Sequence, residues 1–110
     1  MPVLTPPSLE VLAMPVLLCP AHLTADTRVE FRAIALEALE AALAVAAPNV
    51  TLDLGAVVDI DASGLGVLIL LQKRARERHV RVRLLNVPST VERLFDETRM
   101  APLFEIVRTS

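Results

Sequence analysis

The sequence DIDASGLG, residues 59–66, is the most informative stretch of this chain for predicting its fold. It follows an extended apolar segment, Val50–Leu54, and leads into a predicted helix from about Ser63 to Arg78. An acid, a hydroxyl and two glycines therefore lie where a strand hands over to a helix. The first amides of a helix lack intrahelical partners and carry the positive end of its dipole. Such a junction suits recognition of an anion or of a partner backbone, because glycine leaves room for close approach.

On both sides of this stretch, the hydrophobic periodicity of the sequence predicts an α/β fold. A strand, a crossover helix and a second strand imply parallel pairing with a right-handed connection. We therefore expect a mixed, largely parallel β-sheet with helices packed against it, and the 59–66 stretch at its carboxyl end. The predicted elements begin with short strands at Leu9–Ala13 and Pro15–Cys19, a helix from Thr24 or Asp26 to about Ala47, and the Val50–Leu54 strand. The Ser63–Arg78 helix and a strand at Val80–Leu85 follow. The chain then continues with a helix that begins at a Ser89–Glu92 capping box and with an apolar segment at Leu103–Val107.

Composition excludes several classes of function. The 110 residues are 54% hydrophobic but only 3% aromatic, with no Trp or Tyr, so a surface that stacks nucleic-acid bases is not expected. The net charge of −2 combines −6 over residues 1–70 with +4 over residues 71–110, and neither value suits a nucleic-acid partner. No run of about 18 uninterrupted apolar residues exists, which argues against direct membrane insertion. A cytoplasmic protein is the expectation.

The chain length predicts one domain, at residues 9–107, after a flexible N-terminal arm at residues 1–8 that contains three prolines. Cys19 is the single cysteine, which excludes an internal disulfide and a multi-cysteine metal site. We expect no cofactor and no catalytic residue. His22 and His79 have no Ser, Cys or acid partner at motif spacing.

The stretch from Asp61 to Leu68 resembles the signature of the STAS family, named for sulphate transporters and anti-sigma-factor antagonists. That signature is an aspartate, two hydroxyl residues, Gly-Leu-Gly and an apolar run. Weaker similarity extends over Leu9–Val107. The further matching segments are residues 21–24, where Ala21 and Thr24 replace the usual glycine and aspartate, residues 50–54, and residues 91–95 through 103–106, with Arg99 where glycine is common.

This resemblance implies a STAS-like α/β fold and a stand-alone module that binds proteins. Free antagonists of the family bind an anti-sigma factor with serine-kinase activity, or a related regulator, and release a sigma factor. Phosphorylation at the helix start inactivates them, because a doubly charged phosphate blocks a partner docked there. The partner-binding residues would be Asp61, Ala62, Ser63, Gly64, Leu65 and Gly66.

Ala62 stands at the family's phosphoacceptor position and offers no oxygen for phosphorylation. The chain is then a non-switching antagonist held in the binding-competent form. Ser63 is the alternative acceptor, although one residue along a helix turns a side chain by about 100°. A capping or packing hydroxyl is the interpretation that we prefer for Ser63. Asp61 is expected to cap the helix, whereas Gly64 and Gly66 fit close packing and partner contact equally well.

Other interpretations stay open at the level of sequence. The same face would serve a cytoplasmic accessory subunit of a lipid-transporting ABC system, and assembly as a homodimer is compatible with either role. The basic residues from Lys73 to Arg83 fit a solvated helix end better than a site for an acidic partner. Asp59 and Asp61 resemble the Asp-x-Asp motif of aspartate-nucleophile phosphatases. Those enzymes need a remote lysine, and Lys73 is the only lysine in the chain.

Overall fold

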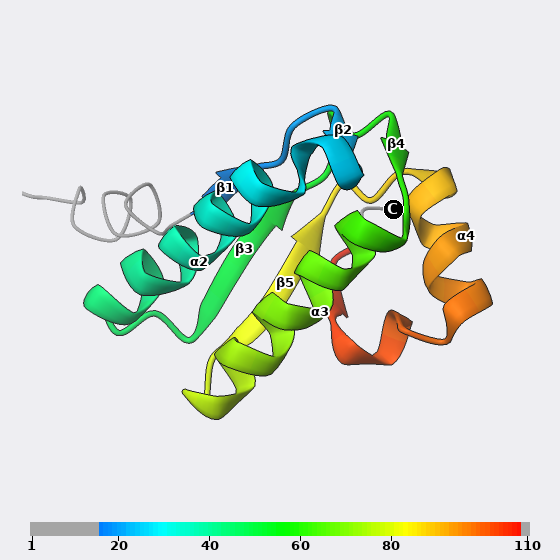
Figure 1. Cartoon of the computed structure of the whole chain (residues 1–110). Coiled ribbons are helices and arrows are strands. Elements are labelled where there is room, and N and C mark those ends of the chain that lie inside the picture. The colour runs from blue at the N-terminus through cyan, green and yellow to red at the C-terminus, as the bar shows by residue number, and fades with distance from the viewer. Residues whose placement is uncertain (1–15, 109–110) are drawn as a thin grey trace, which may run out of the picture.

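A four-stranded sheet forms the scaffold of the computed structural model, which describes residues 16–108 (Figure 1). Its strands lie in the order β1 (Val16–Leu18), β3 (Asn49–Asp53), β5 (Arg81–Leu85) and β6 (Glu105–Ile106), and each neighbouring pair is parallel. The largely parallel α/β fold predicted from the sequence is confirmed. The predicted arm at residues 1–8 and the strand at residues 9–13 lie outside the described residues.

The two central strands supply the sheet's share of the core. The register pairs Val50 with Val82 and Leu52 with Leu84, and all four side chains are buried. They alternate with polar residues along each strand, because successive side chains point to opposite faces. The predicted half-exposed strand at Val80–Leu85 is confirmed by this pattern.

Helices α2 (Arg28–Ala44) and α3 (Ala62–Glu77) lie side by side over one face of the sheet (Figure 1). Phe31 and Leu39 from α2, with Leu68 and Leu71 from α3, are buried against it. The first helix begins later than predicted. A turn of 3₁₀ helix, η1 (Ala25–Thr27), precedes α2, and Thr24 caps that turn rather than the α-helix.

The C-terminal part consists of α4 (Ser89–Thr98), the short 3₁₀ helix η2 (Ala101–Leu103) and β6. The predicted capping box at the start of α4 is wrong. Pro88 occupies the N-cap position without a side-chain hydrogen bond, and the Glu92 carboxylate instead pairs with Arg108. At the other end of α4, Arg99 has φ = 59°, a left-handed conformation that glycine adopts without strain.

A second, two-stranded parallel sheet joins β2 (His22–Leu23) to β4 (Asp59–Ile60). No pattern in the sequence predicted this sheet. It lies at the end of the main sheet toward which the β3 and β5 arrows point, beside the first turn of α3 (Figure 1). The chain therefore enters α3 from a short paired strand, and the motif lies at the carboxyl end of the sheet as expected.

Candidate functional site

Asp61 fixes the start of α3. One carboxylate oxygen, Oδ1, accepts hydrogen bonds from the backbone amides of Ser63 (2.8 Å) and Gly64 (3.1 Å). The other, Oδ2, accepts one from the amide of Ala25 in η1 (3.1 Å). The helix-capping role predicted for Asp61 is confirmed, and the same side chain also ties α3 to the turn that precedes α2. These hydrogen bonds, that from Gly64 foremost, lower the pKa of Asp61 because they favour the ionised carboxylate.

Backbone contacts of the β2–β4 sheet position Asp61. The amide of Asp61 donates to the carbonyl oxygen of Leu23 at 3.1 Å. In the first residue pair of this sheet, Nδ1 of His22 lies 2.6 Å from a carboxylate oxygen of Asp59, and both side chains are exposed. The Thr27 hydroxyl donates to the carbonyl oxygen of His22 at 2.6 Å. Two segments about 36 residues apart in the chain are thus held together directly under the helix start.

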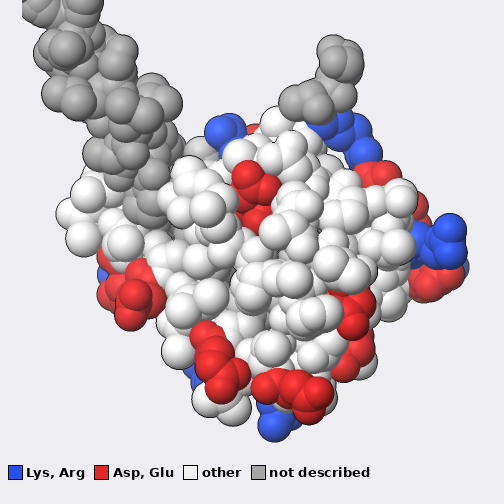
Figure 2. Space-filling model, turned by 90° about the horizontal axis from the view of Figure 1, so that it is seen from above, with Lys and Arg blue, Asp and Glu red and all other residues white. Residues whose placement is uncertain are grey.

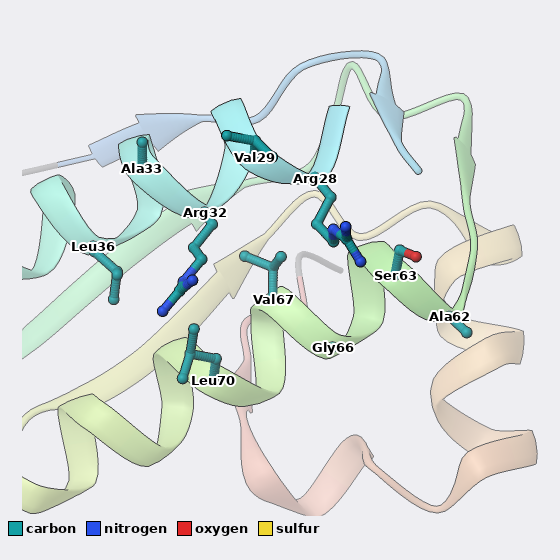
Figure 3. A pocket seen from close by; sticks show the side chains of 10 residues that line it. All are labelled: Arg28, Val29, Arg32, Ala33, Leu36, Ala62, Ser63, Gly66, Val67 and Leu70. Carbon is teal, nitrogen blue, oxygen red and sulfur yellow. The ribbon is translucent and has the colours of Figure 1, made fainter. Parts of the chain in front are cut away.

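Ala62 and Ser63 form the first turn of α3 and differ in exposure. Ala62 is exposed, and its methyl group points away from α2 (Figure 3). Ser63 is partly buried on the side of α2, and its hydroxyl has no hydrogen-bond partner among the described residues. Asp61 caps this turn, so of the capping and packing roles predicted for the Ser63 hydroxyl the structure leaves packing. Position 62, where the resemblance to the STAS family predicts a phosphoacceptor, therefore presents only a methyl group to solvent.

The two glycines of the motif have different environments. A Cβ on Gly64 would lie 2.0 Å from the carbonyl oxygen of Leu23, so this glycine permits contact between α3 and β2. A Cβ on Gly66 would meet no atom within 4 Å. Leu65, between them, is 93% buried and packs into the core. The packing interpretation therefore holds for Gly64, while Gly66 opens the outer surface of the helix.

That outer surface forms one wall of an open groove between α2 and α3, with a volume of about 690 Å³ (Figure 3). The α2 wall bears two arginines, Arg28 and Arg32, whose side chains extend toward α3. Among the described residues that line the groove, Ser63 is the only other one with a polar side chain. The remaining residues are apolar or glycine: Val29, Ala33, Leu36, Ala62, Gly66, Val67 and Leu70.

The alternative catalytic interpretations find little support in the geometry. The Asp59 carboxylate contacts His22, whereas that of Asp61 accepts backbone amides, so the two do not converge on one point as a phosphatase would need. Lys73 follows Asp61 by about 18 Å of helix and is exposed. Within residues 16–108, no group of three or more His, Cys, Asp or Glu side chains is arranged to hold a metal ion.

The remaining residues of interest have structural environments. Burial raises the pKa of the Cys19 thiol to about 12, and the charge of Asp53 makes a smaller contribution in the same direction. The thiol is therefore uncharged, and Cys19 acts as a small buried apolar residue. Lys73 and the arginines of the second half of α3 are exposed, as predicted for a solvated helix end. Arg83 instead pairs with Glu105 at 3.0 Å on the sheet. In the described part of the chain, no helix is long and apolar enough to cross a bilayer.

A family model described as "Mlab, STAS domain" matches residues 17–107. The chain belongs to the STAS domain family. The resemblance expected from the motif is thereby confirmed, and the match covers the sheet, the three α-helices and the groove. Comparison with curated proteins finds no match.

Solved structures share the STAS fold at low sequence identity. A protein from Thermotoga maritima, described as a candidate anti-sigma factor antagonist, matches with a TM-score of 0.69 at 22% identity, over 86% of this chain and 80% of that one. The anti-sigma factor antagonist SpoIIAA in its unphosphorylated form matches with a TM-score of 0.61 at 17% identity, over 86% and 79%. The phosphorylated form of SpoIIAA from Bacillus gives 0.61 at 18%, over 84% and 81%. At these sequence identities, the similarity to the solved structures shows a shared fold and nothing more.

Sequence reasoning missed two parts of the site. The β2–β4 sheet has two residues per strand, too few for any period to be visible. The groove was missed because the sequence predicted helices packed against the sheet, but not that α2 lies beside α3. The one available signal was that Arg28 and Arg32 are the only Lys or Arg in residues 1–70 and are spaced by one helical turn.

Proposed function

We propose that this STAS domain is an anti-sigma-factor antagonist that binds an anti-sigma kinase, or a related regulator, through the exposed start of α3. The observation that carries the proposal is the surface formed by Ala62 and Gly66 beside the Asp61 cap. It is held rigid by backbone and carboxylate hydrogen bonds, yet it presents almost no side chain of its own. A partner backbone can approach such a surface closely.

The antagonist in this proposal is permanently competent for binding. Ala62 has no oxygen to accept a phosphoryl group, so a kinase partner leaves the docking surface unmodified. In a relative with a hydroxyl at this position, a phosphate of about −1.5 to −2 charge would stand between the helix and its partner. Here the complex persists in the presence of ATP.

A second candidate function is that of a cytoplasmic accessory subunit of a lipid-transporting ABC system, bound beside its ATPase. Ala62 is the observation in its favour, because a subunit that stays docked has no use for a switch at the interface. The two candidates use the same surface and differ in the partner.

Binding measured by titration tests the proposal. Gly66→Arg should abolish binding of the purified regulator with the fold retained, because the new side chain projects from an open position. Ala41→Arg, at an exposed position of α2 outside the groove, is the matched control and should bind as wild type does. Wild-type affinity in folded Gly66→Arg protein would place the interface elsewhere. If an ABC ATPase binds in this Gly66-dependent way and no anti-sigma regulator does, the second candidate replaces the first.

Phosphorylation is tested with the same regulator and ATP. Intact-mass measurement should show no added phosphate on the wild-type chain, whereas Ala62→Ser should become modified and then dissociate. Phosphorylation of the wild-type chain at Ser63, with loss of the complex, would contradict the non-switching part of the proposal.

A further inference from the structure

The charge of the α2–α3 groove is opposite to that of the segment that forms it. Residues 1–70 carry eight acids and only two basic residues, and both of these, Arg28 and Arg32, line the groove. Among residues 16–108, no Asp or Glu lines it. Elsewhere carboxylates are scattered over the molecular surface seen in Figure 2, where Lys and Arg lie at the edges. The groove is thus a local positive site on an otherwise acidic half of the chain.

The two arginines are placed where the isolated domain gains little from them. Arg28 is the first residue of α2, so its charge lies at the positive end of the helix dipole. Arg32 follows one turn later on the same side, where the two like charges repel each other. Neither forms a salt bridge within residues 16–108. An anionic occupant of the groove would relieve both unfavourable arrangements.

The apolar residues that line the groove indicate an elongated occupant with an apolar side. Val67 and Leu70 point from α3 toward α2, and Val29 is 70% exposed on α2 (Figure 3). Ala33 and Gly66, small residues on opposite walls, leave room for another backbone. From Arg28 to Leu36 the groove follows α2 for about 12 Å, or two helical turns. Amphipathic helices bind in apolar grooves of this kind.

We infer that the groove accepts an amphipathic helix of a protein partner, with an apolar stripe on the floor and two carboxylates, one turn apart, on Arg28 and Arg32. The spacing of the two arginines favours a helix over a lipid-like molecule with a single charged group. Acids at positions i and i+4 of a helix repeat at the same interval as the two arginines, whereas a lipid-like anion would satisfy only one of them. The groove is continuous with the helix start through Ala62, Ser63 and Gly66. The inference rests on the proposed function in that it assigns the chemistry of the partner at the same site.

A model helix tests the inference without knowledge of the natural partner. The probe is a fluorescein-labelled peptide of about four turns, held helical by a hydrocarbon staple, with a leucine stripe and two glutamates one turn apart beside it. Two matched peptides carry glutamine or lysine in place of the glutamates. Fluorescence anisotropy should show saturable binding of the glutamate peptide, weakened about tenfold in the glutamine peptide and in Arg28→Gln/Arg32→Gln protein.

Charge reversal makes the result specific. Arg28→Glu/Arg32→Glu protein should lose the glutamate peptide and bind the lysine peptide instead. Arg74→Glu/Arg78→Glu protein, altered on two exposed arginines at the C-terminal end of α3 and outside this groove, should behave as wild type does. Circular dichroism confirms that each variant is folded. Equal affinity for the three peptides, or no saturable binding of the glutamate peptide at millimolar concentration, would overturn the inference. A decyl phosphate that competes as well as the peptide would assign the groove to an anionic amphiphile and also overturn it.

The outcome separates this inference from the proposed function. If the natural regulator binds wild-type and Arg28→Glu/Arg32→Glu protein equally, and Gly66→Arg abolishes that binding, the proposed function stands and the groove inference fails. If the peptides follow the charge-reversal pattern while no anti-sigma regulator binds, the groove inference stands and the proposed function fails.

Discussion

The inner and outer faces of the first two turns of α3 come from the same short motif and have opposite properties. On the inner face, Gly64 contacts the Leu23 carbonyl so closely that no Cβ fits, and Leu65 and Leu68 are buried. On the outer face, Gly66 meets nothing within 4 Å and Ala62 is exposed. One motif therefore encodes both the docking of the helix on the fold and an open surface, and substitutions two residues apart should have different consequences.

The largest effect is expected from a charge on the inner face. Leu68→Asp would bury a carboxylate at a fully inaccessible position with no counter-charge, at a cost of about 4 kcal/mol or more. That is close to the total stability of many domains, so the protein should lose cooperative unfolding in urea. Leu70→Asp, at the partly exposed rim of the groove, is the control and should remain folded. A wild-type urea midpoint for Leu68→Asp would contradict the assignment of the inner face.

The next largest loss of stability is expected when a methyl group is added at Gly64, on the inner face. Gly64→Ala places a Cβ 2.0 Å from backbone oxygen, which must move, at a cost of about 1–3 kcal/mol. The loss should outweigh the gain in helix propensity that alanine normally brings. Urea unfolding measures the difference, and hydrogen exchange of the Asp61 amide should accelerate, because its bond to the Leu23 carbonyl is disturbed. An unchanged or increased stability would mean that the contact relaxes without cost.

Between the two faces lies the Asp61 cap, whose effect depends on pH. The folded-state pKa is below the ordinary carboxyl value of about 3.9, so the stabilisation is complete above that pH and is lost as pH falls through the lowered folded value. Asp61→Asn should therefore be less stable than wild type at pH 5–7, and the difference should close in more acidic solution. Asp26→Asn, at an exposed acid of η1, is the control. A stability gap that is independent of pH down to about 2 would show that charge contributes nothing to the cap.

The smallest effect is expected on the outer face, with the opposite sign. Gly66→Ala should stabilise the domain by up to about 1 kcal/mol, because alanine has the higher helix propensity and the new methyl meets no atom. A rise in the urea midpoint, set beside the fall for Gly64→Ala, would show the two faces in one pair of matched variants. A loss of stability in Gly66→Ala would mean that the outer face is less open than the structure shows.

The parts of the fold that repeat with a regular period were predictable from the sequence. Alternation gave the strand at Val80–Leu85, and the apolar run bounded by Asp61 gave α3 to within a residue at each end. The Asp61 cap was predictable because the acid directly precedes the helix. The capping box at Ser89 failed because Glu92 has a partner in Arg108, at the far end of the chain, and tertiary pairing overrode the local pattern.

The site was predictable only in its local part. The motif places Ala62 and Gly66 on a helix start, but the environment of Gly64 depends on β2, which lies about 40 residues earlier in the chain. The groove depends on α2 lying beside α3, and no property of either helix alone encodes that arrangement. For this reason the sequence left Gly64 and Gly66 equivalent, whereas the structure assigns them to opposite faces.

The cap at Asp61 also bears on how such a protein changes over generations. Because this carboxylate holds both Ala25 and the first amides of α3, the architecture of the helix start makes no demand on the side chain at position 62. A single base change in an alanine codon gives serine or threonine. If position 62 is the phosphoacceptor position, as proposed, gain of a phosphorylation switch would be one mutational step that leaves the hydrogen bonds of the helix start untouched.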